Sequence, residues 1–250
     1  MEEITASFKK DLFAGKGVFV TGGTSGIGLG TARAFHALGA VVMATGATEG
    51  ECDLASKDAA NAGINFAPLD VRDAPRITKL LQDVPSLHVV VNAAGVIRRD
   101  VEHDPEQFAE VIAINLNGTM RVCTAAKPML AASKGCAINI ASMLTFFGSP
   151  RAPAYSASKG GIGQLTKSLA AAWAKESIRV NAVAPGWIAT PLTEALRQDQ
   201  EKSRQILMRT PMDRWGTPDE VAGAVVFLAS PAARFITGAI LPIDGGYSAV

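Results

Sequence analysis

Cysteine is scarce in this sequence, which carries only three among its 250 residues. Cys52, Cys123 and Cys136 are widely spaced, and no two of them form a Cys-x-x-Cys pair. This pattern argues against a disulfide framework and against a cysteine-rich zinc site. We therefore interpret them as small unpaired thiols and expect a protein of a reducing compartment, the cytoplasm.

An excess of charge of either sign is also missing. The 24 Lys and Arg residues nearly cancel the 23 Asp and Glu residues, so the strongly basic field of a nucleic-acid-binding protein is excluded. No apolar run approaches the ~18–20 residues that a membrane-spanning helix needs. No apolar run lies before Lys9, so we expect no signal peptide. These absences favour a small-molecule partner over a nucleic acid or a membrane.

Histidine is rare, and its three copies are scattered. His36 falls within a predicted helix, His88 opens a predicted strand and His103 lies in a loop, so we interpret them as surface or packing residues rather than as a general base. Asp53 and Asp58 have no histidine cluster beside them, so no metal site is expected.

Short apolar runs alternate along the chain with stretches of helical spacing. Runs of this kind are typical of strands buried on both faces of a parallel sheet. We predict strands over 17–20, 41–44, 65–69, 88–91, 137–141, 179–184 and 239–243, and helices over 27–38, 74–82, 105–130, 154–175, 192–208 and 218–228, with a short further helix between 46 and 63. The alternation indicates an α/β fold of the Rossmann type, a doubly wound, mainly parallel seven-stranded sheet with helices on both faces.

No repeat or linker interrupts this pattern, so residues 1–250 are expected to form a single domain. The segment of about 190–215 is polar and interrupted by proline, and we interpret it as a lid.

A glycine-rich turn follows the first predicted strand. Its sequence is TGGTSGIG, from Thr21 to Gly28, and a predicted helix begins within it. Gly22 allows a sharp turn, and Gly26 and Gly28 allow a pyrophosphate to approach the backbone and the helix N-terminus. The spacing is GxxxGxG rather than GxGxxG, so the turn favours dinucleotide binding over an ordinary strand-to-helix turn without proving it.

Two later strand ends would face the same ligand. Asp70-Val71 ends the third predicted strand, and the segment NAAG, from Asn92 to Gly95, ends the fourth. Ligands of open parallel sheets bind outside the carboxyl ends of the strands. We expect Asp70 near an adenine and Asn92–Gly95 along a ribose, although Asp70 would also suit a helix N-cap and Asn92 a turn.

Tyr155 and Lys159 lie four residues apart in a predicted helix, so they share a face. A nearby ammonium favours the phenolate and lowers the pKa of a tyrosine toward the working range of a general base. Ser142 follows the strand that ends at Ala141 and is placed to hold a carbonyl or hydroxyl oxygen beside the tyrosine.

Together these motifs resemble those of the short-chain dehydrogenase/reductase family, in order and from about Lys16 to Tyr247. The matching segments are Thr21–Gly28, Asn92–Gly95, Asn115, Ser142, Tyr155–Lys159, Pro185-Gly186 and Asp244–Tyr247. The branch most similar holds 3-oxoacyl-carrier-protein reductases and gluconate and keto-sugar dehydrogenases. The resemblance implies an NAD(P)-dependent oxidoreductase that moves a hydride between nicotinamide and a secondary alcohol or ketone. A 3-oxoacyl-carrier-protein or other carbonyl reductase, and a non-catalytic dinucleotide sensor or scaffold, are the alternatives.

The resemblance also implies roles for single residues. Tyr155 would be the general acid or base, Lys159 would lower its pKa and hold the nicotinamide ribose, Ser142 would orient the substrate, and Asn115 would hold a water of a proton relay. Trp187 would line the substrate pocket. The expected cofactor-binding residues are Gly22, Thr24, Ser25, Ile27, Gly28, Asp70, Val71, Asn92, Ala93, Gly95, Tyr155, Lys159, Pro185, Gly186, Ile188 and Thr190.

The choice between NAD and NADP stays open. Enzymes that use NAD usually end the second strand with an acid, but that position falls near Gly46, where Ala47 and Thr48 are also uncharged. This lack of an acid leans toward NADP, yet the Arg or Lys common in NADP enzymes is missing too, both there and at Ser25.

The sequence carries weaker signals for the substrate and for the oligomeric state. Arg98 and Arg99 follow the NAAG segment, where they would either meet a substrate carboxylate or remain solvated. The helix over 154–175 is rich in small residues and carries an apolar stripe at Leu165, Leu169 and Trp173. With the resemblance, this pattern favours a homotetramer, or else a dimer, assembled through the helices over 105–130 and 154–175.

Overall fold

A parallel sheet forms the centre of the computed structural model, which describes residues 1–250 apart from the side chain of Glu2. Its strands are β1 (Gly17–Thr21), β2 (Val41–Gly46), β3 (Asn65–Pro68), β4 (Leu87–Asn92), β5 (Cys136–Ile140), β6 (Arg179–Pro185) and β7 (Ile240–Ile243). They lie in the order β3-β2-β1-β4-β5-β6-β7, and every neighbouring pair is parallel. The predicted fold class is confirmed, and each predicted strand is present.

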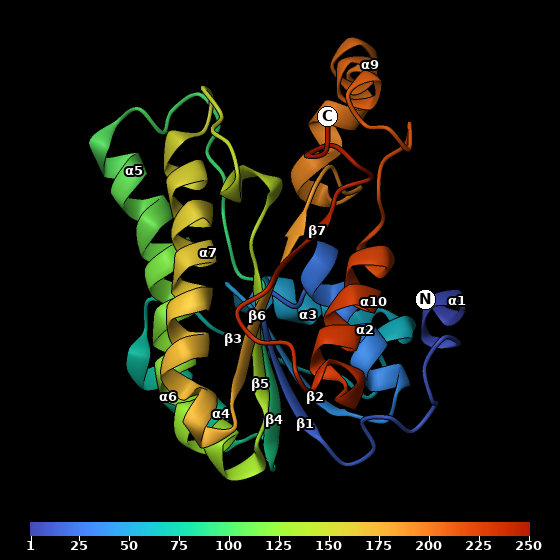
Figure 1. The fold of residues 1–250 in the computed structure, drawn as a ribbon, viewed down its shortest axis with the longest axis vertical. Helices are drawn as coiled ribbons and strands as arrows, with labels where there is room; N and C mark the ends of the chain where they lie inside the picture. The colour runs from blue at the N-terminus through green and yellow to red at the C-terminus, as the bar shows by residue number, and fades with distance from the viewer.

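Helices cover both faces of the sheet (Figure 1). In chain order they are α1 (Glu2–Thr5), α2 (Gly26–Ala37), α3 (Glu49–Lys57), α4 (Ala74–Gln82), α5 (Pro105–Ile112), α6 (Gly118–Ser133), α7 (Pro153–Trp173), α8 (Glu194–Gln198), α9 (Gln200–Met208) and α10 (Pro218–Ala229). Helices α2 and α10 lie on one face, and α4, α6 and α7 on the other. The described part of the chain holds no helix long and apolar enough to cross a bilayer.

The alternation of side chains along each strand explains the two apolar layers. Val18 and Val20 of β1 point into the cluster under α2 and α10, whereas Phe19 between them points into the cluster under α4, α6 and α7. All five residues of β1 are buried. Strands in this position have no solvent-facing side, which is why the sequence shows continuous apolar runs.

The helix predicted over 105–130 is a continuous rod of two α-helices, α5 and α6, joined by a π-helical turn. Asp104 caps α5, a π-helical turn spans Ala113–Asn117, and α6 continues directly from it. A π-turn inserts one residue into the helix and often marks a functional site. Asn115 lies within this turn.

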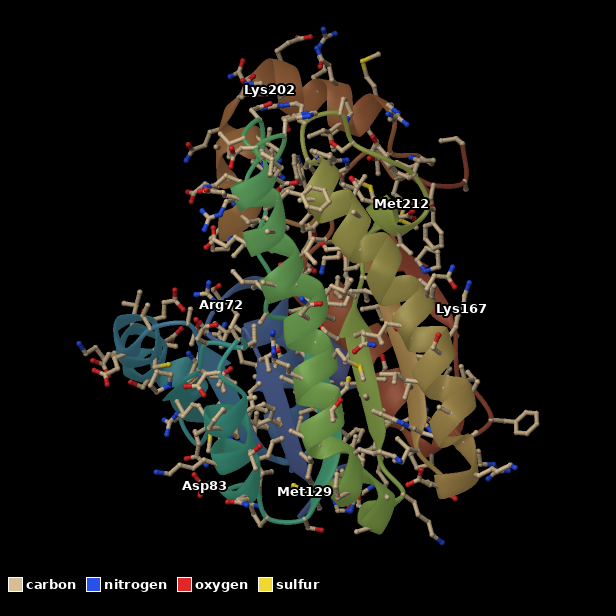
Figure 2. All side chains as sticks on the ribbon, turned by 90° about the vertical axis from the view of Figure 1, so that its left-hand side faces the viewer. Arg72, Asp83, Met129, Lys167, Lys202 and Met212 are labelled. Atoms are coloured by element: carbon tan, nitrogen blue, oxygen red, sulfur yellow. The ribbon has the colours of Figure 1, made fainter. Side chains whose placement is uncertain are left out.

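The apolar stripe on α7 packs against its own sheet. Leu169 and Trp173 are each 7% exposed and belong to the cluster with Val90 and Val180, and Leu165 packs at its edge. The expectation that this stripe is available for assembly is therefore wrong, because the sheet already covers it. The side of α7 that faces away carries small and polar residues: Ala157, Gln164, Lys167, Ser168, Ala171 and Ala172 are exposed. The rod made of α5, the π-turn and α6 lies beside α7 on this surface and meets it through α5 and the π-turn, with Lys167 pointing outward (Figure 2).

The segment over 190–215 lies above the carboxyl ends of the strands (Figure 1). The single helix predicted over 192–208 is instead a 3-10 turn (Pro191–Thr193) followed by α8 and α9. The break falls at Asp199, whose side chain accepts a hydrogen bond from the backbone of Lys202 and so begins a new helix.

Candidate active site

A groove crosses the carboxyl edge of the sheet where the strand order reverses, between β1 and β4. Ligands of doubly wound sheets bind at this position. Of the residues predicted to hold a cofactor, twelve line the groove: Gly22, Thr24, Ser25, Ile27, Gly28, Asp70, Val71, Ala93, Gly95, Tyr155, Lys159 and Thr190.

The glycine-rich turn forms one wall of this groove. Gly22 and Gly26 have φ of +62° and +52°, which side chains disfavour. A Cβ on Gly28 would lie 2.0 Å from the carbonyl oxygen of Gly22. Gly28 is thus required for packing of the helix on the turn itself, whereas the sequence analysis ascribed it to the approach of a pyrophosphate.

The N-terminus of α2 opens into the groove without a side-chain cap. Ser25 is the N-cap residue, yet its side chain accepts no hydrogen bond from the helix. The first amide groups of a helix need acceptors, and together with the helix dipole they favour an anion. Ser25, Ile27 and Gly28 line the groove here, so this end of it suits a phosphate group.

Four of the predicted cofactor residues do not line the groove. Asn92 is 4% exposed and donates to Asn139 Oδ1 at 2.9 Å and to Cys123 Sγ at 3.2 Å, so its side chain ties β4 to its neighbours. Ile188 is 4% exposed and packs in the core. Pro185 ends β6, and the amide of Gly186 donates to Ile243. Asn92 is buried as the last residue of β4, and Ile188 is buried three residues after β6, where it forms a bridge with Gly216.

Tyr155, Ser142 and Lys159 meet at the other end of the groove. Ser142 lies close enough to the phenol of Tyr155 for its side chain to lower the pKa of that phenol. Lys159 is 5% exposed, lies 5.4 Å from the centroid of the Tyr155 ring, and donates from Nζ to the carbonyl of Ile140 at 2.6 Å. The structure therefore brings together three of the residues that the sequence predicted to form the catalytic set.

The pKa values of this cluster have a different cause from the one expected. Burial raises the pKa of Tyr155, and the hydrogen bond from Ser142 and the charge of Arg99 oppose that rise. Burial also lowers the pKa of Lys159 to about 8. The charge of Arg99 is thus a second source of positive charge that favours the phenolate, beside Lys159 at the ring.

Asn115 is 1% exposed and supports the same end of the groove from the π-turn. Its side chain accepts from the amide of Val96 at 2.8 Å and donates to the carbonyl of Val96 at 2.9 Å and to Ser158 Oγ at 3.1 Å. These bonds use its amide to fix the loop after β4 against α7. The side chain predicted to hold a water is thus engaged by protein atoms.

Trp187 lies outside the groove. Its ring packs edge-on against Trp215 at 5.8 Å and Tyr247 at 6.4 Å. It lines a separate cavity with Met212 and Asp244. Its buried Nε1 has no partner among the described residues. Trp187, which was predicted to line the substrate pocket, therefore does not line this groove.

One carboxylate at the end of β2 was not among the predicted site residues. Glu51 lies in the first turn of α3, and its Oε2 accepts from the amide of Ala47 at 2.7 Å. The side chain thereby reaches the groove where an acid was sought at Gly46. The signal was present in the sequence as a Glu four residues after Ala47, but only the turn of the chain at Thr48 makes the two meet.

Comparison with known proteins agrees with this geometry. A family profile described as enoyl-(acyl carrier protein) reductase matches residues 22–248. The chain is 40% identical to a 2-dehydro-3-deoxy-D-gluconate 5-dehydrogenase of Pseudoalteromonas atlantica, over 93% of this chain and 96% of the relative. It is also 40% identical to a galactitol 2-dehydrogenase (L-tagatose-forming) of Cereibacter sphaeroides, over 92% and 93%.

A solved structure is similar over nearly the same length. The gluconate 5-dehydrogenase of Burkholderia cenocepacia, in complex with NADP and tartrate, aligns with a TM-score of 0.89 at 32% identity, covering 96% of this chain and 98% of that one. The chain belongs to the short-chain dehydrogenase/reductase family.

Proposed function

We propose that this protein is an NAD(P)-dependent oxidoreductase that transfers a hydride between nicotinamide and a CH–OH or carbonyl group of a sugar or sugar acid. The observation that carries the proposal is the meeting of Ser142, Tyr155 and Lys159 at one end of a groove whose other end suits a phosphate. The relatives named above, for a sugar acid and a sugar alcohol, support this substrate class.

The proposed chemistry divides between the cofactor and the chain. The bound dinucleotide supplies or accepts the hydride. Tyr155 takes the proton of the alcohol during oxidation and returns it during reduction, and Ser142 holds the substrate oxygen beside it. Such a positioned donor typically contributes ~2.7–4 kcal/mol to stabilising the transition state. Lys159, which lines the same groove, would hold the ribose of the cofactor and adds positive charge beneath the Tyr155 ring.

We assign cofactor binding to residues 22–28 and to the strand ends that line the same groove, with Asn92, Pro185, Gly186 and Ile188 supporting the wall from behind. The groove would take either NAD or NADP. The NADP in the related gluconate 5-dehydrogenase supports a nicotinamide dinucleotide.

We also propose that residues 1–250 act as a single catalytic domain, that the segment over 190–215 is its lid and that the protein is a homotetramer of the cytoplasm. The cysteines are free and buried, as suits a reducing compartment. A non-catalytic sensor would have no need of Ser142 and a buried lysine on either side of the Tyr155 phenol.

A panel of sugar acids, sugar alcohols and their ketones, tested with both cofactors, checks the proposal through the absorbance of the reduced nicotinamide. Tyr155→Phe should remove nearly all turnover and leave cofactor affinity within a few fold, because it deletes only the proton-carrying hydroxyl. A variant that keeps more than a tenth of the activity would exclude Tyr155 as the proton-transfer residue.

A further inference from the structure

The loop between β4 and α5 carries a cation beside Tyr155 that has no partner. We propose that Arg99 binds the carboxylate of the substrate, so that the enzyme acts on hydroxy and keto acids in preference to neutral sugar alcohols. The inference rests on the proposed function, because it names the substrate class of the same site.

The position of Arg99 is fixed by bonds on both sides of it. Glu102 is 1% exposed, and its carboxylate accepts from the amide of Arg98 at 2.7 Å and from the amide of Tyr155 at 2.8 Å. It thereby ties the loop to the first turn of α7. On the other side, the amide of Asp100 donates to the carbonyl of Arg151 at 2.8 Å.

Every neighbouring charge already has a partner. Asp100 and Arg151 form an ion pair through two bonds of 2.7 and 2.5 Å. Arg98, the other arginine of the motif, pairs with Glu110 at 3.0 Å. The carboxylate of Glu102 is occupied by two backbone amides. In the part of the chain that the structure describes, no hydrogen bond or ion pair involves the guanidinium of Arg99.

Arg99 is half-buried, so water solvates its charge incompletely. Burial lowers its pKa from the ordinary value, and the charge of Tyr155 opposes this shift most, followed by the charges of Glu102 and Asp100. A partly desolvated cation without a partner is costly, and an anion that arrives with a ligand relieves that cost. The unpaired guanidinium of Arg99 is therefore stabilised only when an anionic group of a ligand lies beside Tyr155.

A carboxylate fits this position better than other anions would. The planar guanidinium makes two parallel hydrogen bonds to a carboxylate, which fixes orientation as well as position. An alcohol that reacts at Tyr155 would therefore be held at a second point along its carbon chain. A sugar alcohol offers only neutral hydroxyls to Arg99 and leaves its charge unpaired.

Calorimetric titration of the enzyme loaded with reduced cofactor tests the assignment, because that complex cannot oxidise an added alcohol. The probes are D-gluconate and D-glucitol, which differ in a carboxylate against a CH2OH group at one end. The wild type should bind gluconate at least tenfold more tightly than glucitol. Arg99→Gln should remove that difference, and Arg99→Lys should restore part of it.

Arg98→Gln is the matched control, since it removes an adjacent and already paired arginine. It should change gluconate affinity less than twofold. The carboxylate assignment would be overturned if the wild type bound the two probes equally or bound neither. It would also be overturned if Arg98→Gln and Arg99→Gln lost equal amounts of gluconate affinity. Turnover of neutral alcohols by the same enzyme supplied with oxidised cofactor would leave the oxidoreductase function standing, so the two failures are distinguishable.

Discussion

Lys159 is buried without an acidic partner, and its charge has a cost in stability. Its pKa of about 8 lies below the ordinary 10.5 because of burial alone. Below pH 8 the lysine is charged in both the folded and the unfolded chain, so the whole cost is present. Above 10.5 it is neutral in both and the cost vanishes.

Lys159→Met should therefore raise the free energy of unfolding at pH 7, by up to about 3 kcal/mol from the 2.5-unit difference in pKa, while abolishing turnover. The difference in free energy of unfolding between the variant and the wild type should decrease as the pH rises from 8 to 10.5. Urea unfolding at several pH values measures this difference. Lys167→Met, on the exposed side of the same helix, is the control and should show no such trend. A variant less stable than wild type at every pH would contradict the argument.

Glu51 places a negative charge at the end of β2, where the 2′-position of an adenosine ribose would lie. The carboxylate repels a 2′-phosphate and is able to accept a bond from a 2′-hydroxyl. Glu51→Gln should raise the affinity for NADP relative to NAD roughly tenfold, about 1.4 kcal/mol. Fluorescence titration with both dinucleotides measures the ratio. Glu49→Gln removes a charge outside the groove wall and should change the ratio less.

The position of Glu51 beside Ala47 also limits which side chains can replace Gly46. A Cβ there would lie 2.7 Å from Thr24 Cγ2 and 3.0 Å from Glu51 Oε2. Placing an aspartate at this position, the obvious route to NAD preference from the sequence, would bring two carboxylates together and crowd the glycine-rich turn. We therefore expect cofactor choice in this chain to be controlled from α3 rather than from the end of β2.

At the scale of elements, the segment over 190–215 is attached to the groove at its first residues. Thr190 and Leu192 line the groove, and Thr190 Cγ2 would lie 3.3 Å from a Cβ on Gly26. Leu192, Met208 and Met212 are at least half exposed, so the segment buries little of its apolar surface. Segments of this kind open more readily than a sheet.

Backbone amides over 190–215 should exchange faster than those of β4 and β5 in the free enzyme and slow markedly when NAD or NADP is added. Hydrogen–deuterium exchange followed by mass spectrometry reads out this change by peptide. The buried strand β5 serves as the internal control. Equal protection of 190–215 with and without cofactor would exclude its role as a lid.

At the scale of the molecule, the exposed side of the α5–α6 rod and α7 offers the surface for assembly (Figure 2). Small residues on α7 allow close approach of a second helix, and Phe108 and Met120 on the rod are 37% and 39% exposed. We expect a tetramer of about four chain masses by light scattering. Ala171→Glu with Ala172→Glu should reduce its size, whereas Lys9→Glu on the distant leader should not. A monomeric wild type at micromolar concentration would contradict the assembly.

Sequence alone was sufficient for the features that depend on local pattern. Buried parallel strands must be apolar on both faces, so seven short runs predicted seven strands. Tyr155 and Lys159 share a helix face because four residues make about one turn. Positive φ at Gly22 and Gly26 follows from the freedom that only glycine has.

Tertiary structure alone decided the features that depend on which side chains meet. Asn92 and Leu169 face the interior because neighbouring strands and the sheet cover them, and no local signal distinguishes that burial from exposure. Glu51 reaches the groove only because the chain turns at Thr48. Arg98 and Arg99 are identical in type and adjacent, yet one pairs with Glu110 and the other stays free beside Tyr155. Contacts between segments distant in the chain set these differences, because burial and charge pairing act through space rather than along the sequence.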